Sequence, residues 1–220
     1  MKKTALLLGA TGLIGSNCLN YLLADDSYKL VKVITRRSLK RTHPKLKEYI
    51  IDFNQLEKPN VVFSCEDVFC CLGTTIKKAG SEENFRLVDF EYPLQTASLS
   101  LAAGAKQYLL VSSIGSDKNS RNFYLRVKGE VEDAISKLNF NSFLIFRPSL
   151  LLGARNEIRF AEKIGGAAAK ILSPLFLGGL KKYKPIEAKD VAKAMVVLAN
   201  QNQTGIKIII SDEIKKKTDE

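Results

Sequence analysis

Apolar residues in the chain fall into short continuous runs that alternate with longer segments in which they recur with helical periodicity. A continuous apolar run is typical of a strand whose two faces are both buried in a parallel sheet. The runs predict strands at 4–8, 30–35, 49–52, 67–72, 107–112, 142–147 and 207–211. The periodic segments predict helices at 13–24, 83–103, 123–138, 156–172 and 189–200.

The regular alternation of strand and helix predicts an α/β fold with a doubly wound parallel sheet of the Rossmann type. A chain of 220 residues suits one domain spanning 1–220. The sequence after Pro148 is rich in small residues, so 148–220 is expected to contribute a small C-terminal cap on the substrate side. The last residues, "IKKKTDE", are expected to fray.

The net charge of +11 comes from short basic clusters such as "RRSLKR" at 36–41. Solvated loops are favoured over nucleic-acid binding, because no zinc-finger spacing or aromatic RNA-binding motif accompanies the clusters. Phosphorylated small molecules would suit the same charges. His43 is the only histidine, so no histidine-based metal site is expected.

The four cysteines form no Cys-x-x-Cys motif, which predicts reduced and mostly buried thiols in a cytosolic protein. The opening "MKKTALLLGA" imitates a signal peptide, but glycines interrupt its apolar run, and a first buried strand explains it better. No apolar segment approaches the ~20 residues that span a bilayer. We therefore expect a cytoplasmic protein without a membrane partner.

Three glycines, Gly9, Gly12 and Gly15, follow the first predicted strand in "LLLGATGLIG" and open the first helix. Glycine at these positions lets the backbone turn tightly and approach a pyrophosphate, which then lies at the positive end of the helix. The spacing alone is a weak signal, but its place between a strand and a helix strengthens it. The sequence therefore predicts a dinucleotide site rather than a plain tight turn.

The residues after the second strand indicate which dinucleotide is bound. An acidic residue about 20 positions after the glycines would hold the ribose hydroxyls of NAD. This chain has Arg36 and Arg37 there, and a guanidinium group matches a 2′-phosphate, which favours NADP(H) over a merely solvated loop. Asp52 and Phe53 end the third strand and suit the covering and hydrogen bonding of adenine, although a structural strand end explains them almost as well.

The fourth and fifth strands end in small and polar residues. "CCLGTT" at 70–75 is where the chain of such folds passes the adenosine ribose. Cys70 and Cys71 are expected to face opposite sides of the sheet as core residues, in preference to a redox pair. Ser112 and Ser113 emerge at the carboxyl edge, where ligands of this fold class bind. A hydroxyl there suits a substrate carbonyl oxygen, whereas an isolated serine pair would more often cap a turn.

Tyr124 precedes Lys128 by four residues in "NFYLRVKGEVE", so the two side chains share one face of the helix predicted at 123–138. The same spacing occurs by chance in many helices. Here the helix follows the strand that bears the serines, which places the pair at the nicotinamide end of the cofactor. A neighbouring ammonium favours the phenolate form of a tyrosine, so the pair fits acid/base chemistry during hydride transfer.

The motifs "CCLGTT", "SSIGSDKNSRNFYLRVKGEVE" and "FRPSLLL" resemble the atypical group of the short-chain dehydrogenase/reductase superfamily, in the branch typified by the Tat-interacting-protein oxidoreductases. The similarity covers roughly residues 4–200, with the motifs in the expected order. The resemblance assigns the pyrophosphate to the glycine turn, the 2′-phosphate to the arginines and the nicotinamide to Leu151. The cofactor-binding residues that it implies are Gly9, Thr11, Gly12, Leu13, Ile14, Gly15, Arg36, Arg37, Leu72, Gly73, Lys128, Leu151 and Arg159.

The resemblance also implies a function, the NADPH-dependent reduction of a small carbonyl compound. Tyr124 would be the acid/base, Lys128 would bind the nicotinamide ribose, and Ser113, with Ser112 as the alternative, would orient the carbonyl group. Members of this branch are better known for binding NADPH than for settled substrates, so a regulatory NADPH-binding protein with little turnover is the alternative. Related reductases often form homodimers through the helices that correspond to 83–103 and 123–138.

Overall fold

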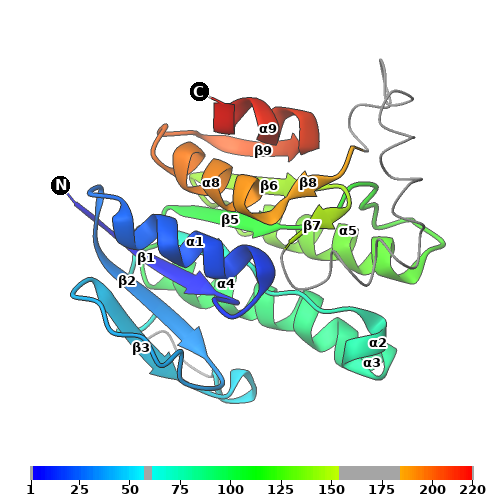
Figure 1. Cartoon of the computed structure of the whole chain (residues 1–220). Helices are drawn as coiled ribbons and strands as arrows, with labels where there is room; N and C mark the ends of the chain where they lie inside the picture. The colour runs from blue at the N-terminus through cyan, green and yellow to red at the C-terminus, as the bar shows by residue number, and fades with distance from the viewer. Residues whose placement is uncertain (1, 57–60, 154–183, 220) are drawn as a thin grey trace.

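The computed structural model of the protein describes residues 2–56, 61–153 and 184–219. In this part of the chain, seven parallel strands form one sheet in the order β3-β2-β1-β4-β5-β6-β9, and β7 pairs with β8 separately (Figure 1). The strands are β1 (Lys3–Leu8), β2 (Tyr28–Thr35), β3 (Leu46–Ile50), β4 (Asp67–Cys70), β5 (Gln107–Val111), β6 (Ser142–Arg147), β7 (Leu151–Leu152), β8 (Ile186–Glu187) and β9 (Gly205–Ile210). The predicted doubly wound parallel sheet is confirmed.

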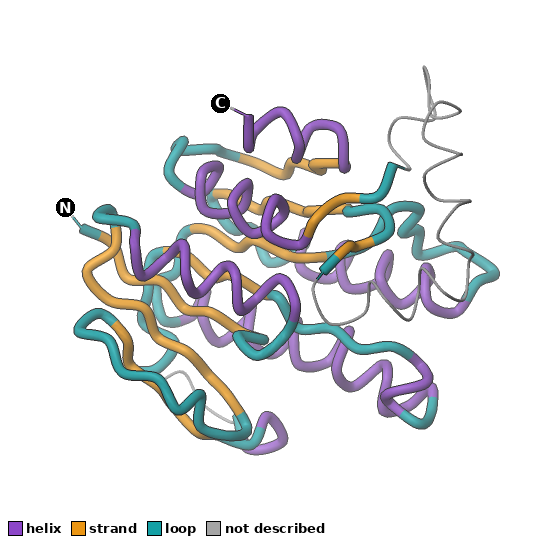
Figure 2. The backbone as a smooth tube through the Cα atoms, in the orientation of Figure 1, coloured by secondary structure: helices purple, strands orange, loops and turns teal. Residues whose placement is uncertain are grey.

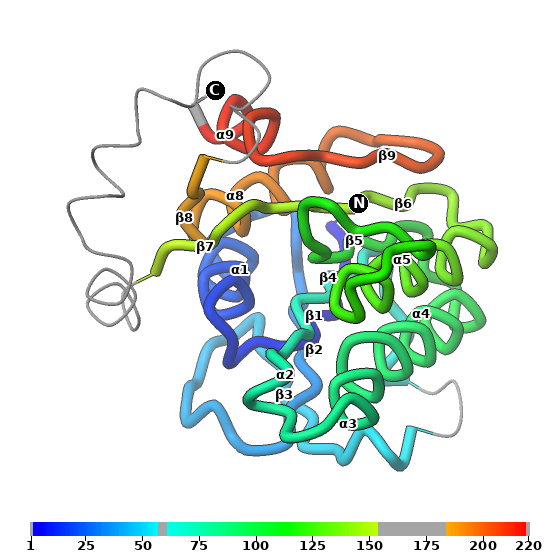
Figure 3. Tube along the Cα trace, turned by 90° about the vertical axis from the view of Figure 1, so that its right-hand side faces the viewer, coloured from blue at the N-terminus to red at the C-terminus, as the bar shows by residue number. Residues whose placement is uncertain are grey.

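Helices cover both faces of the sheet (Figure 2). Figure 3 shows α1 and α8 on one face and α4 and α5 on the other. The helical elements are α1 (Leu13–Ala24), the 3-10 turn η1 (Phe53–Gln55), α2 (Ile76–Ala79), α3 (Glu82–Arg86), the π-helical turn η2 (Leu87–Glu91), α4 (Tyr92–Ala102), α5 (Phe123–Ser136), α8 (Ala188–Ala199) and α9 (Ser211–Asp219). The strand order reverses between β1 and β4, which is where folds of this class bind their ligands.

Two hydrophobic clusters, one on each face of the sheet, hold the three layers together. Successive residues of a strand point to opposite faces, so Leu7 of β1 joins the cluster beneath α1, while Leu6 and Leu8 join the one beneath α4 and α5. Leu22 of α1 and Ile135 of α5 are fully buried in these two clusters. Beyond their first residues the central strands are therefore apolar on both faces, which is the pattern seen in the sequence.

Buried polar side chains join five adjacent strands at the amino edge of the sheet. Asp67 of β4 accepts a hydrogen bond from the Tyr28 hydroxyl of β2 at 2.6 Å and pairs with the Lys3 ammonium of β1 at 2.6 Å. Gln107 of β5 donates to Asp67 at 3.3 Å and accepts from the Ser142 hydroxyl of β6 at 3.0 Å. Because a buried polar group without a partner is costly, this network penalises any shift of strand register.

The helix predicted at 83–103 is divided into α3, η2 and α4. α3 begins after Ser81, whose hydroxyl accepts a hydrogen bond from the Asn84 N–H at 3.1 Å. Pro93 stands in the first turn of α4 and has no N–H to donate, while the Tyr92 N–H bonds to the Leu87 carbonyl oxygen across the wider π-helical turn. The turn inserts a single residue into the helical repeat, which leaves the apolar pattern nearly unchanged. The sequence therefore predicted one continuous helix.

The C-terminal residues form α9, so the expectation that they fray is wrong. Ile214 is fully buried in the cluster that α8 shares. Lys215 of α9 pairs with Asp190 of α8 at 2.8 Å, and the Lys193 ammonium donates to the Thr218 carbonyl oxygen at 2.6 Å. The lysine-rich composition favoured a frayed end, although the segment forms a helix with one buried face. The helix predicted at 156–172 lies outside the described residues.

Candidate functional site

The turn after β1 is built from glycines that have no space for a side chain. Gly9 has a φ of +79°, and a Cβ atom on it would lie 2.4 Å from the Cys71 carbonyl oxygen. A Cβ atom on Gly15 would lie 2.1 Å from the Gly9 carbonyl oxygen. Gly9 therefore brings the turn against the end of β4, and Gly15 packs α1 against the turn.

The N-terminus of α1 offers backbone N–H groups to a ligand. Its N-cap, Gly12, makes no side-chain hydrogen bond, and no acidic side chain lies in the first helical turn. Thr11, Gly12 and Leu13 are exposed, whereas Ile14 is buried in the core. Free N–H groups and the positive end of the helix dipole suit a phosphate group. The residues present therefore fit the pyrophosphate of a dinucleotide.

The chain after β7 lies on the same helix terminus. A Cβ atom on Gly153 would lie 2.4 Å from Leu13 Cδ1, so this segment rests directly on the first turn of α1. Leu151 is half-buried and packs against the cluster beneath α1. Its position is compatible with the predicted contact to the cofactor. Arg159 lies outside the described residues.

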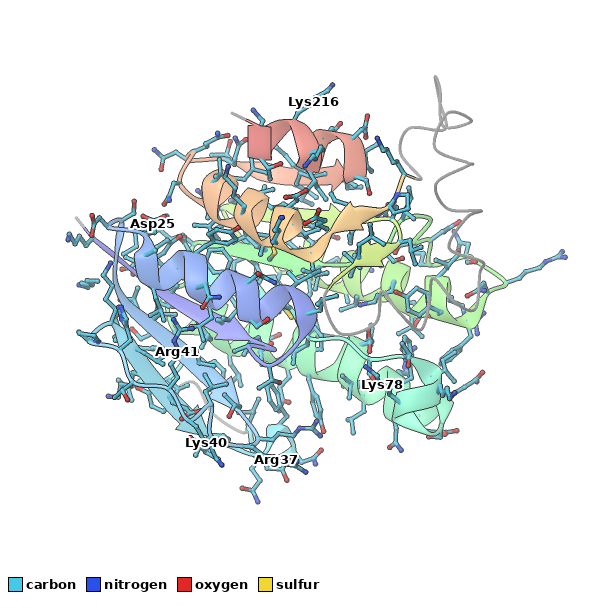
Figure 4. All side chains as sticks on the ribbon, viewed as in Figure 1. Asp25, Arg37, Lys40, Arg41, Lys78 and Lys216 are labelled. Carbon is cyan, nitrogen blue, oxygen red and sulfur yellow. The ribbon has the colours of Figure 1, made fainter. Side chains whose placement is uncertain are left out.

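Arg36 and Arg37 follow β2, and both are exposed. Neither guanidinium group forms an ion pair with another described residue. The Arg37 N–H donates to the Thr35 hydroxyl at 3.2 Å, which fixes the backbone of the turn. Figure 4 shows Arg37 and Lys40 at the lower edge of the molecule, near the ends of β2 and β3. Guanidinium groups in this position are complementary to a 2′-phosphate.

Asp52 and Phe53 lie at the turn η1. The Asp52 carboxylate caps this turn by accepting a hydrogen bond from the Asn54 N–H at 3.0 Å. The Phe53 ring is buried against Tyr92, with the ring centroids 5.1 Å apart. A structural role, which is one of the two alternatives for this pair, accounts for both side chains. Because the Phe53 ring is buried, only the backbone of Phe53 would be available to contact adenine.

A buried carboxylate lies beside the turn after β4. Asp89 of η2 accepts a hydrogen bond from the Thr74 N–H at 2.9 Å and pairs with the Lys128 ammonium at 2.8 Å. A Cβ atom on Gly73 would lie 3.5 Å from Asp89 Oδ1 and 3.8 Å from Lys128 Nζ. Gly73 and the half-buried Leu72, which were predicted to line the adenosine ribose, therefore lead the chain past this ion pair.

Tyr124 and Lys128 lie one turn apart on α5, as their spacing predicts. Tyr124 is half-buried, and its ring packs against Phe85 with the centroids 5.6 Å apart. Burial lowers the pKa of Lys128, but the Asp89 carboxylate and the Tyr124 phenol outweigh burial, so that the net pKa is raised. Lys128 is therefore held as a cation inside the protein.

The two serines after β5 have different surroundings. Ser112 is buried, and its hydroxyl donates to Glu132, which also forms a bidentate ion pair with Arg147. The Ser113 hydroxyl is half-buried, and its partner among the described residues is the Ile114 carbonyl oxygen at a long 3.4 Å. Ser113 is thus the serine with a hydroxyl available to a ligand, which supports it over Ser112 as the candidate.

Cys70 and Cys71 face opposite sides of the sheet, as predicted. Cys70 belongs to the cluster beneath α4 and α5, and Cys71 packs against the cluster beneath α1. Burial raises the pKa of Cys70 to about 11, and a hydrogen bond with the Cys18 thiol, together with burial, holds the pKa of Cys71 well above its usual range. All four cysteines are free, and the raised pKa values of Cys70 and Cys71 fit core thiols rather than reactive thiolates.

Sequence reasoning missed two acidic residues of the site, Asp89 and Glu132. Glu132 follows Lys128 at the same four-residue spacing that separates Lys128 from Tyr124, so the helix face contained a signal for it. Asp89 had no such signal, because it belongs to another helical segment and reaches Lys128 only through the fold.

A known protein family matches most of the chain. The sequence model of the NAD dependent epimerase/dehydratase family matches residues 5–210. The chain belongs to this family. The family belongs to the Rossmann superfamily and is similar to the short-chain dehydrogenases/reductases. The resemblance found in the motifs is therefore confirmed. A nicotinamide dinucleotide is supported as the cofactor.

Two curated relatives support the branch as well. Protein HTATIP2 of Rattus norvegicus is 40% identical over 164 residues, which are 73% of this chain and 67% of that protein. The protein FMP52 of Candida albicans, named mitochondrial, is 33% identical over 208 residues, which are 90% of this chain and 89% of that protein. The predicted similarity to the Tat-interacting-protein branch is therefore confirmed.

Two solved structures share the fold at low sequence identity. MoeE5 in complex with UDP-glucose and NAD has a TM-score of 0.69 at 15% identity, covering 96% of this chain and 79% of that chain. The UDP-glucose 4-epimerase of Thermotoga maritima has a TM-score of 0.68 at 16% identity, covering 94% of this chain and 77% of that chain. At such identities these likenesses show the fold alone.

The expected cytoplasmic location is wrong. Relatives from Candida albicans, Aspergillus niger and other fungi are named mitochondrial, which contradicts this expectation. The expectation failed because reduced thiols argue only against the secretory route. Within the described residues, no helix has the length and apolarity needed to cross a membrane.

Proposed function

We propose that the protein is an NADP(H)-dependent oxidoreductase that reduces a small carbonyl compound at the carboxyl edge of the sheet. The observation that carries the proposal is the pair of Tyr124 and Lys128 on α5, with Lys128 held as a buried cation beside the turn after β4. The preference for NADP(H) over NAD(H) rests on Arg36 and Arg37, which have no acidic partner among the described residues.

When bound, the dinucleotide supplies the hydride. The residues of the chain divide the remaining tasks. The Ser113 hydroxyl donates a hydrogen bond to the substrate carbonyl oxygen and orients it. Tyr124 gives its phenolic proton to the same oxygen, and the Lys128 ammonium stabilises the phenolate that remains and holds the nicotinamide ribose. A positioned acid of this kind contributes ~10²–10⁴ in rate.

A binding protein with little or no turnover is the second candidate function, and Asp89 is the observation that favours it. Its carboxylate balances the charge of Lys128 at 2.8 Å, so the ammonium is suited to hold a ribose without assisting a proton transfer. Under this hypothesis, occupancy by NADPH controls a partner, and Tyr124 and Lys128 serve as cofactor ligands.

One experiment separates the two candidates. Calorimetry first measures the affinity for NADPH, and the loss of NADPH absorbance is then followed with a panel of aldehydes, ketones and quinones. Turnover that is lost in Tyr124→Phe at unchanged NADPH affinity supports the reductase. Binding without oxidation of NADPH by any member of the panel supports the binding protein, and failure to bind either dinucleotide contradicts both. A homodimer through α4 and α5 stays a prediction, which sedimentation velocity can check.

A further inference from the structure

Asp89 and Lys128 form the most deeply buried ion pair among the described residues, with side chains that are 0% and 6% exposed. Buried charges are costly unless they are paired and hydrogen-bonded. Asp89 satisfies both conditions, since one oxygen contacts the Lys128 ammonium and the other accepts from the Thr74 N–H. A carboxylate with two such different partners connects the turn after β4 to α5.

The π-helical turn η2 places the carboxylate between these two segments. π-helical turns are rare in proteins, and a large share of those that occur lie at functional sites. Here the turn precedes Pro93, and Asp89, at its centre, is only 1% exposed. A Cβ atom on Gly73 would be in van der Waals contact with both Asp89 and Lys128. The ion pair is therefore adjacent to the backbone that is predicted to line the cofactor ribose.

We propose that Asp89 is a positioning residue that fixes the Lys128 ammonium and the Thr74 N–H in the places where the bound dinucleotide needs them. The inference rests on the proposed function, because it assumes that the dinucleotide passes over Gly73. An amide of the same shape offers one accepting oxygen, and its NH₂ group would face the other donor. Loss of the carboxylate should therefore disturb both segments.

The charges around Lys128 predict how this loss depends on pH. Burial lowers the pKa of Lys128, while Asp89 from η2, Tyr124 from α5 and Cys70 from β4 all raise it, with Asp89 foremost. In Asp89→Asn the foremost of these contributions is absent and burial remains, so Lys128 loses its proton at a lower pH than in the parent. A neutral amine donates weaker hydrogen bonds to the ribose hydroxyls than an ammonium does. Affinity for NADPH should then fall as the pH rises.

The test measures the dissociation constant of NADPH by calorimetry at about pH 7 and about pH 9.5, the second of which lies closer to the pKa of an ordinary lysine. Asp89→Asn should weaken binding by about 10- to 100-fold, the loss expected when a hydrogen bond to a charged group is removed, and by more at the higher pH. The parent should show no such pH dependence. Asp133→Asn is the control, because it removes a carboxylate from α5, the helix of Lys128, and this carboxylate pairs with Lys118 and Lys137 instead.

Asp89→Glu keeps the charge and moves it by one methylene, so it answers the question if Asp89→Asn does not fold. Positioning predicts a smaller loss of affinity without pH dependence, whereas a mere counter-ion predicts an unchanged dissociation constant. NADPH affinity equal to that of the parent in a folded Asp89→Asn protein at both pH values, or in Asp89→Glu, overturns the inference. A parent protein that does not bind NADPH contradicts the proposed function itself, so the two failures are distinguishable.

Discussion

Replacing both arginines after β2 should remove the preference for NADPH over NADH. Arg36 and Arg37 are exposed at the carboxyl edge of the sheet, and the described residues provide neither with an ion-pair partner. The 2′-phosphate is the group that distinguishes the two cofactors. The double variant Arg36→Ala/Arg37→Ala should therefore lose affinity for NADPH and keep its affinity for NADH.

The exposure of the two side chains sets the size of the effect. Two unit charges 4 Å apart interact with about 4 kcal/mol at an effective dielectric constant of about 20, and with about 1 kcal/mol in bulk water. Because both arginines are solvent-exposed, the lower end applies, and we expect about 1–1.5 kcal/mol for each. Together these contributions correspond to a loss of about 30- to 150-fold in NADPH affinity. Raising the salt concentration should reduce the preference of the parent.

Calorimetry with NADPH and NADH measures all four affinities of the parent and the double variant. Arg41→Ala is the control: it removes one positive charge from the same loop, half of what the double variant loses, but its guanidinium group is bound to Asn20 of α1, and it lies apart from Arg37 (Figure 4). A parent that binds the two cofactors equally, or a preference that survives in the double variant, would refute the argument. A loss of binding free energy in Arg41→Ala that is half of the loss in the double variant would show that net charge alone determines the affinity.

Three further predictions concern the acid, the sheet and the thiols. Tyr124→Phe should reduce single-turnover hydride transfer by at least ~10², since the proton donor is lost, and an unchanged rate would favour the binding protein. Tyr28→Phe should lower the free energy of unfolding in urea by about 1.5–3 kcal/mol, because its hydroxyl donates to the buried Asp67 carboxylate; an unchanged midpoint would show that water replaces this hydrogen bond. Cys70 and Cys71 should react slowly with a thiol reagent in the native protein and rapidly on unfolding, and fast native labelling that abolishes NADPH binding would indicate a redox role.

The order of the elements could be predicted because each central strand is buried on both faces. The strand predicted at 142–147 and the helix predicted at 13–24 agree with β6 and α1. Once a parallel sheet is established, every strand ends at the same edge, so Gly9, Arg36 and Ser113 gather there without any knowledge of their contacts. The general position of the site therefore followed from the sequence.

Two local features did not follow from apolar periodicity. A π-helical turn adds only one residue to the repeat of an α-helix. The apolar pattern of the sequence therefore did not reveal η2 at Leu87–Glu91. α9 was missed for a different reason: its buried face depends on Ile214 and on contacts of polar side chains with α8. In both cases tertiary packing, rather than local pattern, determines the structure.

Lys128 shows how far a motif can be interpreted without the fold. The four-residue spacing from Tyr124 predicts which helix face the lysine occupies, but the environment of that face comes from η2, which is distant in the chain. An ammonium as buried as Lys128 needs a carboxylate to remain charged, and Asp89 provides it at 2.8 Å. The same Tyr-x-x-x-Lys spacing without Asp89 would leave a lysine whose pKa burial lowers, and with it a weaker cationic ligand for a ribose. The motif therefore predicts that Tyr124 and Lys128 take part in the site. Asp89, which pairs with Lys128, determines whether the lysine is charged when the cofactor binds.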